Sequence, residues 1–75
     1  MTPREAALAV LGEDGGPLHR TVVLDRALRA GYLDPFTTPD VRGAIFAALR
    51  ELAADGVIVR TDKGVYEASP KAPPA

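Results

Sequence analysis

The sequence contains no cysteine and a single histidine. The absence of cysteine excludes disulfides and thiolate metal sites, and one histidine cannot form a His-rich metal site. No apolar run approaches the roughly 20 residues needed to cross a bilayer. The N-terminus also lacks the charged-then-apolar pattern of a signal peptide. We therefore expect a cytoplasmic protein that does not associate with membranes.

Positive charge is not in surplus either. Nine lysines and arginines against ten acidic residues give a formal net charge of −1, whereas a dedicated DNA-binding domain usually has a basic surplus. What is present is a chain of 75 residues, 47% of them apolar, which suits one small globular domain. A core of this size is marginal, since only about 60% of the unfolded surface is buried on folding.

Two helices are expected in the first half of the chain. The run TPRE at positions 2–5 has the form of a capping box, with proline at the first helical position and a glutamate able to reach back. This helix should end between Gly12 and Pro17, where glycines and a proline cannot continue it. A second helix should begin with Thr21 as its N-cap and end at Gly31.

The links that follow these helices also have an expected structure. Residues 17–20 should form a short extended segment whose Leu18 points inward and which pairs with a later hairpin as a third strand. The longer link at residues 31–38 carries Tyr32, Leu33 and Phe36. The simplest interpretation is that these three side chains fold back over the edge of the core, since large exposed apolar patches are rare.

The last third of the sequence indicates a helix that leads directly into a β-hairpin. Thr38 is the expected N-cap of a helix over Pro39–Asp55, and Gly56 should end it. Residues 57–60 and 65–68 are rich in strand-forming side chains. The four residues between these strands should form a turn that closes with a glycine at positive φ.

These elements predict one domain at residues 1–68, followed by a proline-rich tail at residues 69–75 that is expected to be disordered. Three helices and a two-stranded wing predict a mainly α fold with a small β-hairpin, namely a winged helix-turn-helix. The link between the second and third helices is longer than the turn of about three to four residues in a tight helix-turn-helix.

Four segments resemble the HARE-HTH winged-helix domains of restriction endonucleases, chromatin-associated proteins and the RNA polymerase delta subunit. The segments are TPREAALAVL from position 2, GPLH from position 16, TTPDVRGAIFAALREL from position 37 and DKGVY from position 62. The resemblance covers roughly residues 2–68. It implies a winged-helix fold and a DNA-binding role in transcription or in a restriction-type system.

A DNA-binding surface is the first candidate function. In helix-turn-helix proteins the outer face of the recognition helix enters the major groove, and here that face carries Gly43, Ala47 and Arg50, with Arg42 on its flank. Arginine can bind guanine through two hydrogen bonds, and the small residues would permit a close approach of the backbone. The other cations expected to contact phosphates are Arg26, Arg29, Arg60 and Lys63.

Two observations leave other interpretations open. Carboxylates are interleaved with the arginines, so the arginines can equally form an ordinary solvated surface, and Glu51 and Asp55 would oppose phosphates. Tyr32, Phe36 and Phe46 could instead anchor a protein partner, such as a second copy of the chain or RNA polymerase. They could also simply complete the small core.

The sequence contains no recognisable constellation for catalysis. His19 has no nucleophilic serine or cysteine beside it, and we expect it to fix the start of the second helix through a hydrogen bond. Residues 12–16 are rich in glycine but lack the lysine of a phosphate-binding loop. The prediction is a non-enzymatic protein without cofactor or metal, whose partner is double-stranded DNA or another protein.

Overall fold

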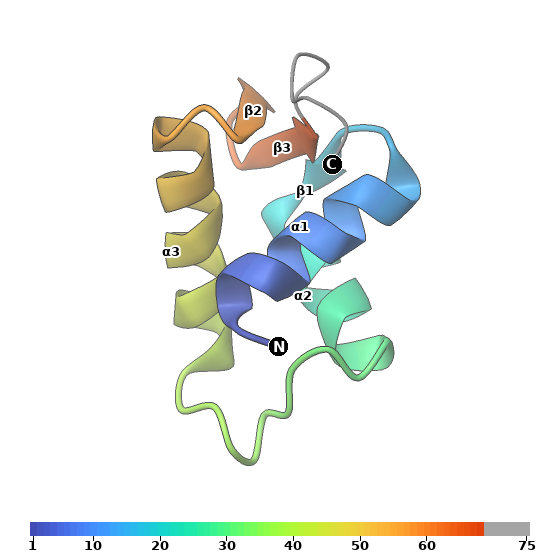
Figure 1. Cartoon of the computed structure of the whole chain (residues 1–75), viewed down its shortest axis with the longest axis vertical. Coiled ribbons are helices and arrows are strands. Elements are labelled where there is room, and N and C mark those ends of the chain that lie inside the picture. The colour runs from blue at the N-terminus through green and yellow to red at the C-terminus, as the bar shows by residue number, and fades with distance from the viewer. Residues whose placement is uncertain (69–75) are drawn as a thin grey trace.

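The computed structural model describes residues 1–68, which form three helices and a three-stranded antiparallel sheet (Figure 1). This mainly α arrangement with a small hairpin has the layout of a winged helix, so the predicted fold class is confirmed. The tail predicted to be disordered, residues 69–75, lies outside the described residues. The elements are α1 (Pro3–Asp14), β1 (Leu18–His19), α2 (Arg20–Arg29), α3 (Val41–Ala54), β2 (Ile58–Asp62) and β3 (Val65–Ala68).

Helix α1 begins with the predicted capping box. The Thr2 hydroxyl accepts a 3.2 Å hydrogen bond from the Glu5 backbone N–H, and the Glu5 carboxylate accepts a 2.9 Å bond from the Thr2 backbone N–H. Hydrogen bonds from Thr2 to the Glu5 carboxylate, first from its backbone N–H and then from its side chain, lower the pKa of Glu5. The helix continues through Gly12 and ends at Asp14, within the predicted range, and Gly15 follows at a φ of 74°.

The start of α2 differs from the prediction. His19, rather than Thr21, is the N-cap: its Nδ1 accepts a 3.3 Å hydrogen bond from the Thr21 backbone N–H and lies 2.8 Å from the Thr21 hydroxyl. Thr21 is therefore already inside the first turn. The predicted hydrogen bond by which His19 fixes the start of this helix is confirmed. Gly31 follows the helix at a φ of 75°, as predicted.

Helix α3 also begins later than predicted. Asp40 is its N-cap, with a φ of 47°, and its carboxylate accepts a 3.2 Å hydrogen bond from the Gly43 backbone N–H. Aspartate tolerates this left-handed conformation better than most residues, and its short side chain reaches the free amides of the first turn. Thr38 and Pro39 lie in the preceding turn, so the predicted cap at Thr38 is wrong. Gly56, at a φ of 78°, follows the helix as expected.

The sheet has the order β1-β3-β2, so β3 is its middle strand. Leu18 of β1 lies opposite Tyr66 of β3, which confirms the third strand predicted for the link between α1 and α2. The hairpin turn is shorter than predicted, because β2 extends to Asp62 and Gly64, at a φ of 70°, directly precedes β3. A register shift in β2 lies between Arg60 and Asp62.

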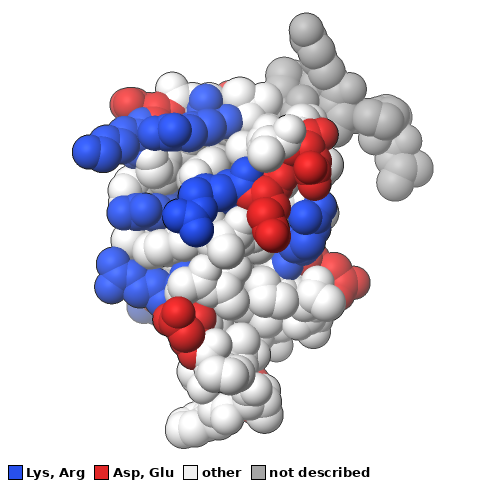
Figure 2. Space-filling model, turned by 90° about the vertical axis from the view of Figure 1, so that its left-hand side faces the viewer, with Lys and Arg blue, Asp and Glu red and all other residues white. Residues whose placement is uncertain are grey.

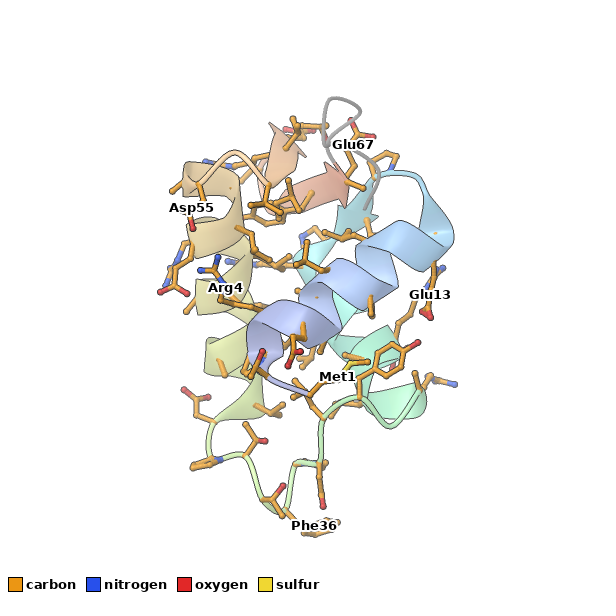
Figure 3. All side chains as sticks on the ribbon, in the orientation of Figure 1. Met1, Arg4, Glu13, Phe36, Asp55 and Glu67 are labelled. Carbon is orange, nitrogen blue, oxygen red and sulfur yellow. The ribbon has the colours of Figure 1, made fainter. Side chains whose placement is uncertain are left out.

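All three helices and the hairpin contribute to one hydrophobic core. In the link before α3, Leu33 is buried and Tyr32 packs against the core, as predicted, but Phe36 is 96% exposed. The Asp34 carboxylate accepts a 2.8 Å hydrogen bond from the Phe36 backbone N–H, and Phe36 lies at the far end of the link, away from the core (Figure 3). The largest fully buried side chains are Leu11, Ile45, Leu49, Leu52, Val10 and Val23.

Candidate nucleic-acid interface

Two arginine guanidinium groups lie over one aromatic ring on α3. Phe46 is half-buried, and the guanidinium carbons of Arg20 and Arg42 lie 4.6 and 5.3 Å from its ring centroid. Both distances are within the range of cation–π attraction. Arg42, Phe46 and Arg50 are spaced by four residues and so form one ridge along the helix. The ring therefore connects the start of α2 to this ridge.

A hollow of about 320 Å³ lies between the start of α2, α3 and the hairpin. Four cations line it: Arg20 from α2, Arg50 from α3, and Arg60 and Lys63 from the hairpin. We call this hollow and its four cations the basic pocket. The described residues that line it include no carboxylate, and the remaining three are His19, Gly64 and Tyr66.

Local hydrogen bonds hold the walls of the basic pocket together. The backbone N–H of Arg20 donates a 2.7 Å hydrogen bond to the carbonyl of Gly64, and His19 pairs with Val65 across the sheet. A Cβ atom added to Gly64 would lie only 3.1 Å from the His19 Nε2. The hairpin turn therefore packs closely against the first residues of α2.

Two of the predicted DNA contacts lie elsewhere. Arg26 forms a 2.7 Å ion pair with Asp14, and Arg29 forms a 2.8 Å ion pair with Asp25 one turn earlier in the same helix. Neither arginine lines the basic pocket. Their charges are largely compensated by these carboxylates, which is the alternative that the sequence left open.

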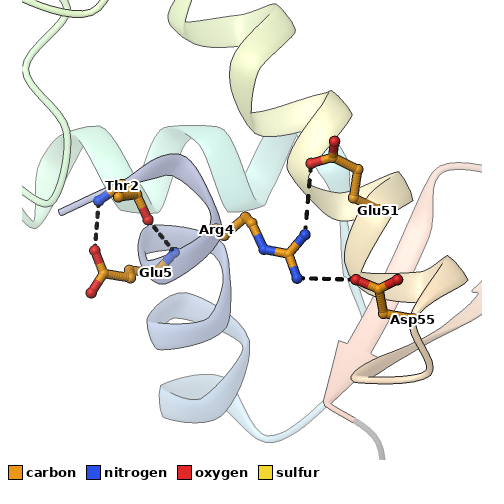
Figure 4. A network of polar contacts seen from close by, with 5 residues as sticks. All are labelled: Thr2, Arg4, Glu5, Glu51 and Asp55. Atoms are coloured by element: carbon orange, nitrogen blue, oxygen red, sulfur yellow. Dashed lines mark hydrogen bonds and ion pairs between the residues drawn. The ribbon is translucent and has the colours of Figure 1, made fainter.

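The two carboxylates expected to oppose phosphates are engaged by an arginine of α1. Arg4 lies 3.8 Å from the Glu51 carboxylate and 3.1 Å from that of Asp55 (Figures 3 and 4). All three side chains are about half-exposed. The acidic residues at the end of α3 are thus partly neutralised from the α1 side.

Positive charge is consequently segregated on the molecule. Among the described residues, the ion pairs involve Arg4, Arg26 and Arg29 but neither Arg42 nor any of the four pocket cations. In the view toward α3, lysine and arginine side chains gather mostly toward one edge, and much of the acidic surface lies toward the other (Figure 2). The formal net charge of −1 conceals this separation.

The small residues of α3 have local roles. The Gly43 backbone N–H is bound to Asp40, and a Cβ atom at this position would overlap the Asp40 carboxylate. Gly43 therefore makes room for the cap of the helix. Ala47 is half-buried. Of the predicted outer face of α3, only Arg50 is exposed and lines the basic pocket.

Sequence reasoning did not assign Arg20 or His19 to this surface. The sequence predicts that Arg20 lies in the extended link and that His19 has only a structural role. One sequence signal could have placed Arg20 at this surface, namely the predicted pairing of residues 17–20 with the hairpin. A residue at the end of a strand that pairs with the hairpin must lie beside the hairpin turn. The contact between Arg20 and Gly64 follows from that pairing.

The three aromatic residues considered for protein contact have different environments. The Tyr32 hydroxyl donates a hydrogen bond to the Glu13 carboxylate, which raises the pKa of Tyr32. Phe46 lies under two guanidinium groups. Only Phe36 is free of the core.

Two further features bear on the class of protein. In the described part of the chain, no helix is both long and apolar enough to cross a membrane. Within the same residues, no group of three or more potential ligand side chains could hold a metal ion.

Comparisons with protein families, curated proteins and solved structures give no match. The functional argument therefore depends on the geometry of the basic pocket and the α3 ridge.

Proposed function

We propose that this chain is a small DNA-binding protein, acting in transcription or in a restriction-type system, that contacts duplex DNA through α3, the start of α2 and the hairpin. The observation that carries the proposal is a group of cations on one side of the molecule that form no ion pair with any described carboxylate. The group consists of Arg20, Arg42, Arg50, Arg60 and Lys63. Such a basic surface is the usual electrostatic mark of nucleic-acid binding.

The spacing along α3 supports a role as recognition helix. Arg42 and Arg50 are separated by about 12 Å along the helix axis, from the rise of about 1.5 Å per residue. This distance is comparable to the width of the major groove, about 12 Å. Either arginine could bind guanine or a phosphate there, while Arg60 and Lys63 of the hairpin would contact the neighbouring backbone.

The net charge of −1 is compatible with this proposal. Exposed charges are screened over about 8–10 Å at physiological salt, so DNA at the basic pocket would respond mainly to the nearby cations. The carboxylates in ion pairs with Arg4, Arg26 and Arg29 contribute less. The resemblance to HARE-HTH domains gives independent support from the sequence.

Fluorescence anisotropy with labelled duplex DNA at low salt tests the proposal. Arg42→Ala plus Arg50→Ala should weaken binding about tenfold or more, because two phosphate or base contacts are lost. The matched control is Arg26→Ala plus Arg29→Ala, which changes the net charge equally but removes cations already paired with carboxylates. The proposal would be contradicted if the wild type did not bind the duplex, or if both double variants lost the same amount of DNA affinity.

A second candidate function is protein contact, as a homodimer or an RNA polymerase-docking module without DNA binding. The observation that favours it is Phe36, which is 96% exposed at the end of the link between α2 and α3. Aromatic side chains are common anchors of protein interfaces. This candidate predicts a molecular mass that increases with concentration, or binding to a protein partner but not to DNA.

A further inference from the structure

The basic pocket is a hollow, whereas the phosphates of a duplex follow a continuous line. Its four cations come from α2, α3 and the hairpin and line one hollow of about 320 Å³. A row of cations along the surface would suit a continuous phosphate backbone. Cations that surround a single space instead concentrate positive potential there. The hollow is therefore suited to one highly charged anionic group.

The hydrogen-bond donors of the pocket match a phosphate group. Arginine presents a planar fork of N–H donors and lysine a point charge, and both are common phosphate ligands. His19 adds a further donor: because its Nδ1 accepts from the Thr21 backbone N–H, the proton of the neutral ring is on Nε2. That nitrogen lies next to Gly64 in the wall of the pocket.

A terminal phosphate uses these donors better than a phosphate within a strand. A phosphomonoester has three terminal oxygens and carries about −1.5 to −2 charges at neutral pH. A bridging diester has two such oxygens and one charge, and sugars flank it on both sides. Four cations and an imidazole N–H exceed what one diester can bind, so the donor set favours the monoester.

The volume leaves room for the rest of a nucleotide. The hollow of about 320 Å³ is many times the volume of about 10–15 Å³ that a cavity needs to hold one water. A phosphate group alone does not fill it. Tyr66, which is 6% exposed, also lines the hollow and is its one aromatic lining residue among those described.

We propose that the basic pocket binds a terminal phosphate group, either at the 5′ end of a nucleic-acid strand or on a free nucleotide. The inference rests on the proposed function for the nucleic-acid source, because it uses the same cations. Without an anion, the four like charges of the pocket repel one another. Occupation by a phosphomonoester should therefore also stabilise the folded chain.

The first experiment compares one blunt duplex with and without 5′-phosphates by anisotropy. We expect the phosphorylated duplex to bind roughly fivefold more tightly, as charge-assisted hydrogen bonds are added. Lys63→Ala should abolish this ratio. Arg42→Ala is the matched control: Arg42 lies on the α3 ridge outside the pocket, so its loss should weaken both duplexes and preserve the ratio.

The second experiment needs no duplex binding. Deoxyadenosine 5′-monophosphate and deoxyadenosine are each titrated into the ¹⁵N-labelled protein and followed by NMR, with inorganic phosphate as a further probe. We expect the monophosphate, but not the nucleoside, to shift the backbone amides of His19, Arg20 and Gly64 and to raise the melting temperature. Lys63→Ala should remove both effects.

The outcomes distinguish the two proposals. Equal duplex affinities together with unshifted pocket amides would overturn the phosphate pocket and leave duplex binding intact. Pocket shifts without any duplex binding would support a site for a free nucleotide and overturn the proposed function. A phosphate preference in the duplex experiment alone would identify the strand end as the source. Failure of both experiments, with no duplex binding, would overturn both proposals.

Discussion

The backbone N–H of Arg20 donates a 2.7 Å hydrogen bond to the carbonyl oxygen of Gly64. This bond joins the first residue of α2 to the residue that closes the hairpin turn. It fixes the position of the hairpin relative to the helix, so the cations on the two elements are held at a defined separation. The basic pocket therefore depends on the conformation of one glycine.

Replacement of that glycine should be costly. Gly64 has a φ of 70°, and an added Cβ atom would lie 3.1 Å from the His19 Nε2. We expect Gly64→Ala to lower the free energy of unfolding by about 1–2 kcal/mol, from backbone strain and the close contact. Urea denaturation measures the change, and an unchanged midpoint would contradict the account of the turn.

Gly12→Ala is the matched control. Gly12 lies inside α1, and an added Cβ atom would meet nothing within 4 Å. Alanine is favoured over glycine in a helix by about 0.5–1 kcal/mol. The same substitution should therefore stabilise the protein here, so the two variants should shift the urea midpoint in opposite directions.

The separation of charge predicts that removing one carboxylate will improve DNA binding. Glu51 lies on α3 next to Arg50, and its carboxylate is 3.8 Å from Arg4. Glu51→Gln should increase the affinity for duplex DNA about two- to threefold at low salt, and the gain should shrink as salt screens the charge. Stability should change by less than about 1 kcal/mol, as is usual for an exposed ion pair. A weaker affinity would show that Glu51 does not oppose phosphates.

Phe36 distinguishes the two candidate functions. Because its side chain is 96% exposed, Phe36→Ser should change the free energy of unfolding by no more than about 0.5 kcal/mol. DNA affinity should be unaffected. If the protein self-associates through this residue, light scattering will give a mass that rises with concentration for the wild type and stays monomeric for the variant. Self-association that persists in the variant would exclude Phe36 as the anchor.

The capping box of α1 predicts a pH dependence. Hydrogen bonds from Thr2 place the pKa of Glu5 below its ordinary value of 4.5. A carboxylate with a lowered folded-state pKa stabilises the fold fully above its unfolded pKa, and this contribution is lost as pH falls through the folded-state pKa. The stability difference between wild type and Glu5→Gln should accordingly shrink below about pH 4.5.

An NMR titration of the Glu5 carboxyl measures this pKa directly. The Thr2→Ala variant removes the side-chain hydrogen bond that contributes to lowering the pKa of Glu5 and keeps the backbone one, so this pKa should return part of the way toward its ordinary value. A midpoint at or above 4.5 in the wild type would contradict the capping geometry.

Local sequence signals predicted the elements better than their boundaries. The run Thr2-Pro3 starts a helix as expected, whereas the similar run Thr38-Pro39 does not, because Asp40 competes for the same role. Asp40 takes the left-handed conformation and binds the Gly43 amide. Two good caps within three residues cannot be ranked by local preference alone, since their geometry in the folded chain decides between them.

The candidate site was harder to predict because charges are compensated across long stretches of sequence. Arg4 and Asp55 are 51 residues apart in the sequence, yet their side chains are 3.1 Å apart. Arg26 and Asp14 come from different helices. The sequence therefore suggested Arg42 and Arg50 as leading contacts and Arg26 and Arg29 as supporting ones, and it did not suggest Arg20. Only the packing of the helices distinguishes the arginines in ion pairs from those at the pocket.

The strand order has a consequence for how the chain folds during its synthesis on the ribosome. β3 is the middle strand, but it is the last described element of the chain to be synthesised. Until it emerges from the ribosome, β1 has no neighbour and β2 is a lone strand. The earlier helices can meet before then, yet the wall formed by Gly64 and Tyr66 is missing. In a nascent chain the hollow should therefore form only once β3 has joined the sheet.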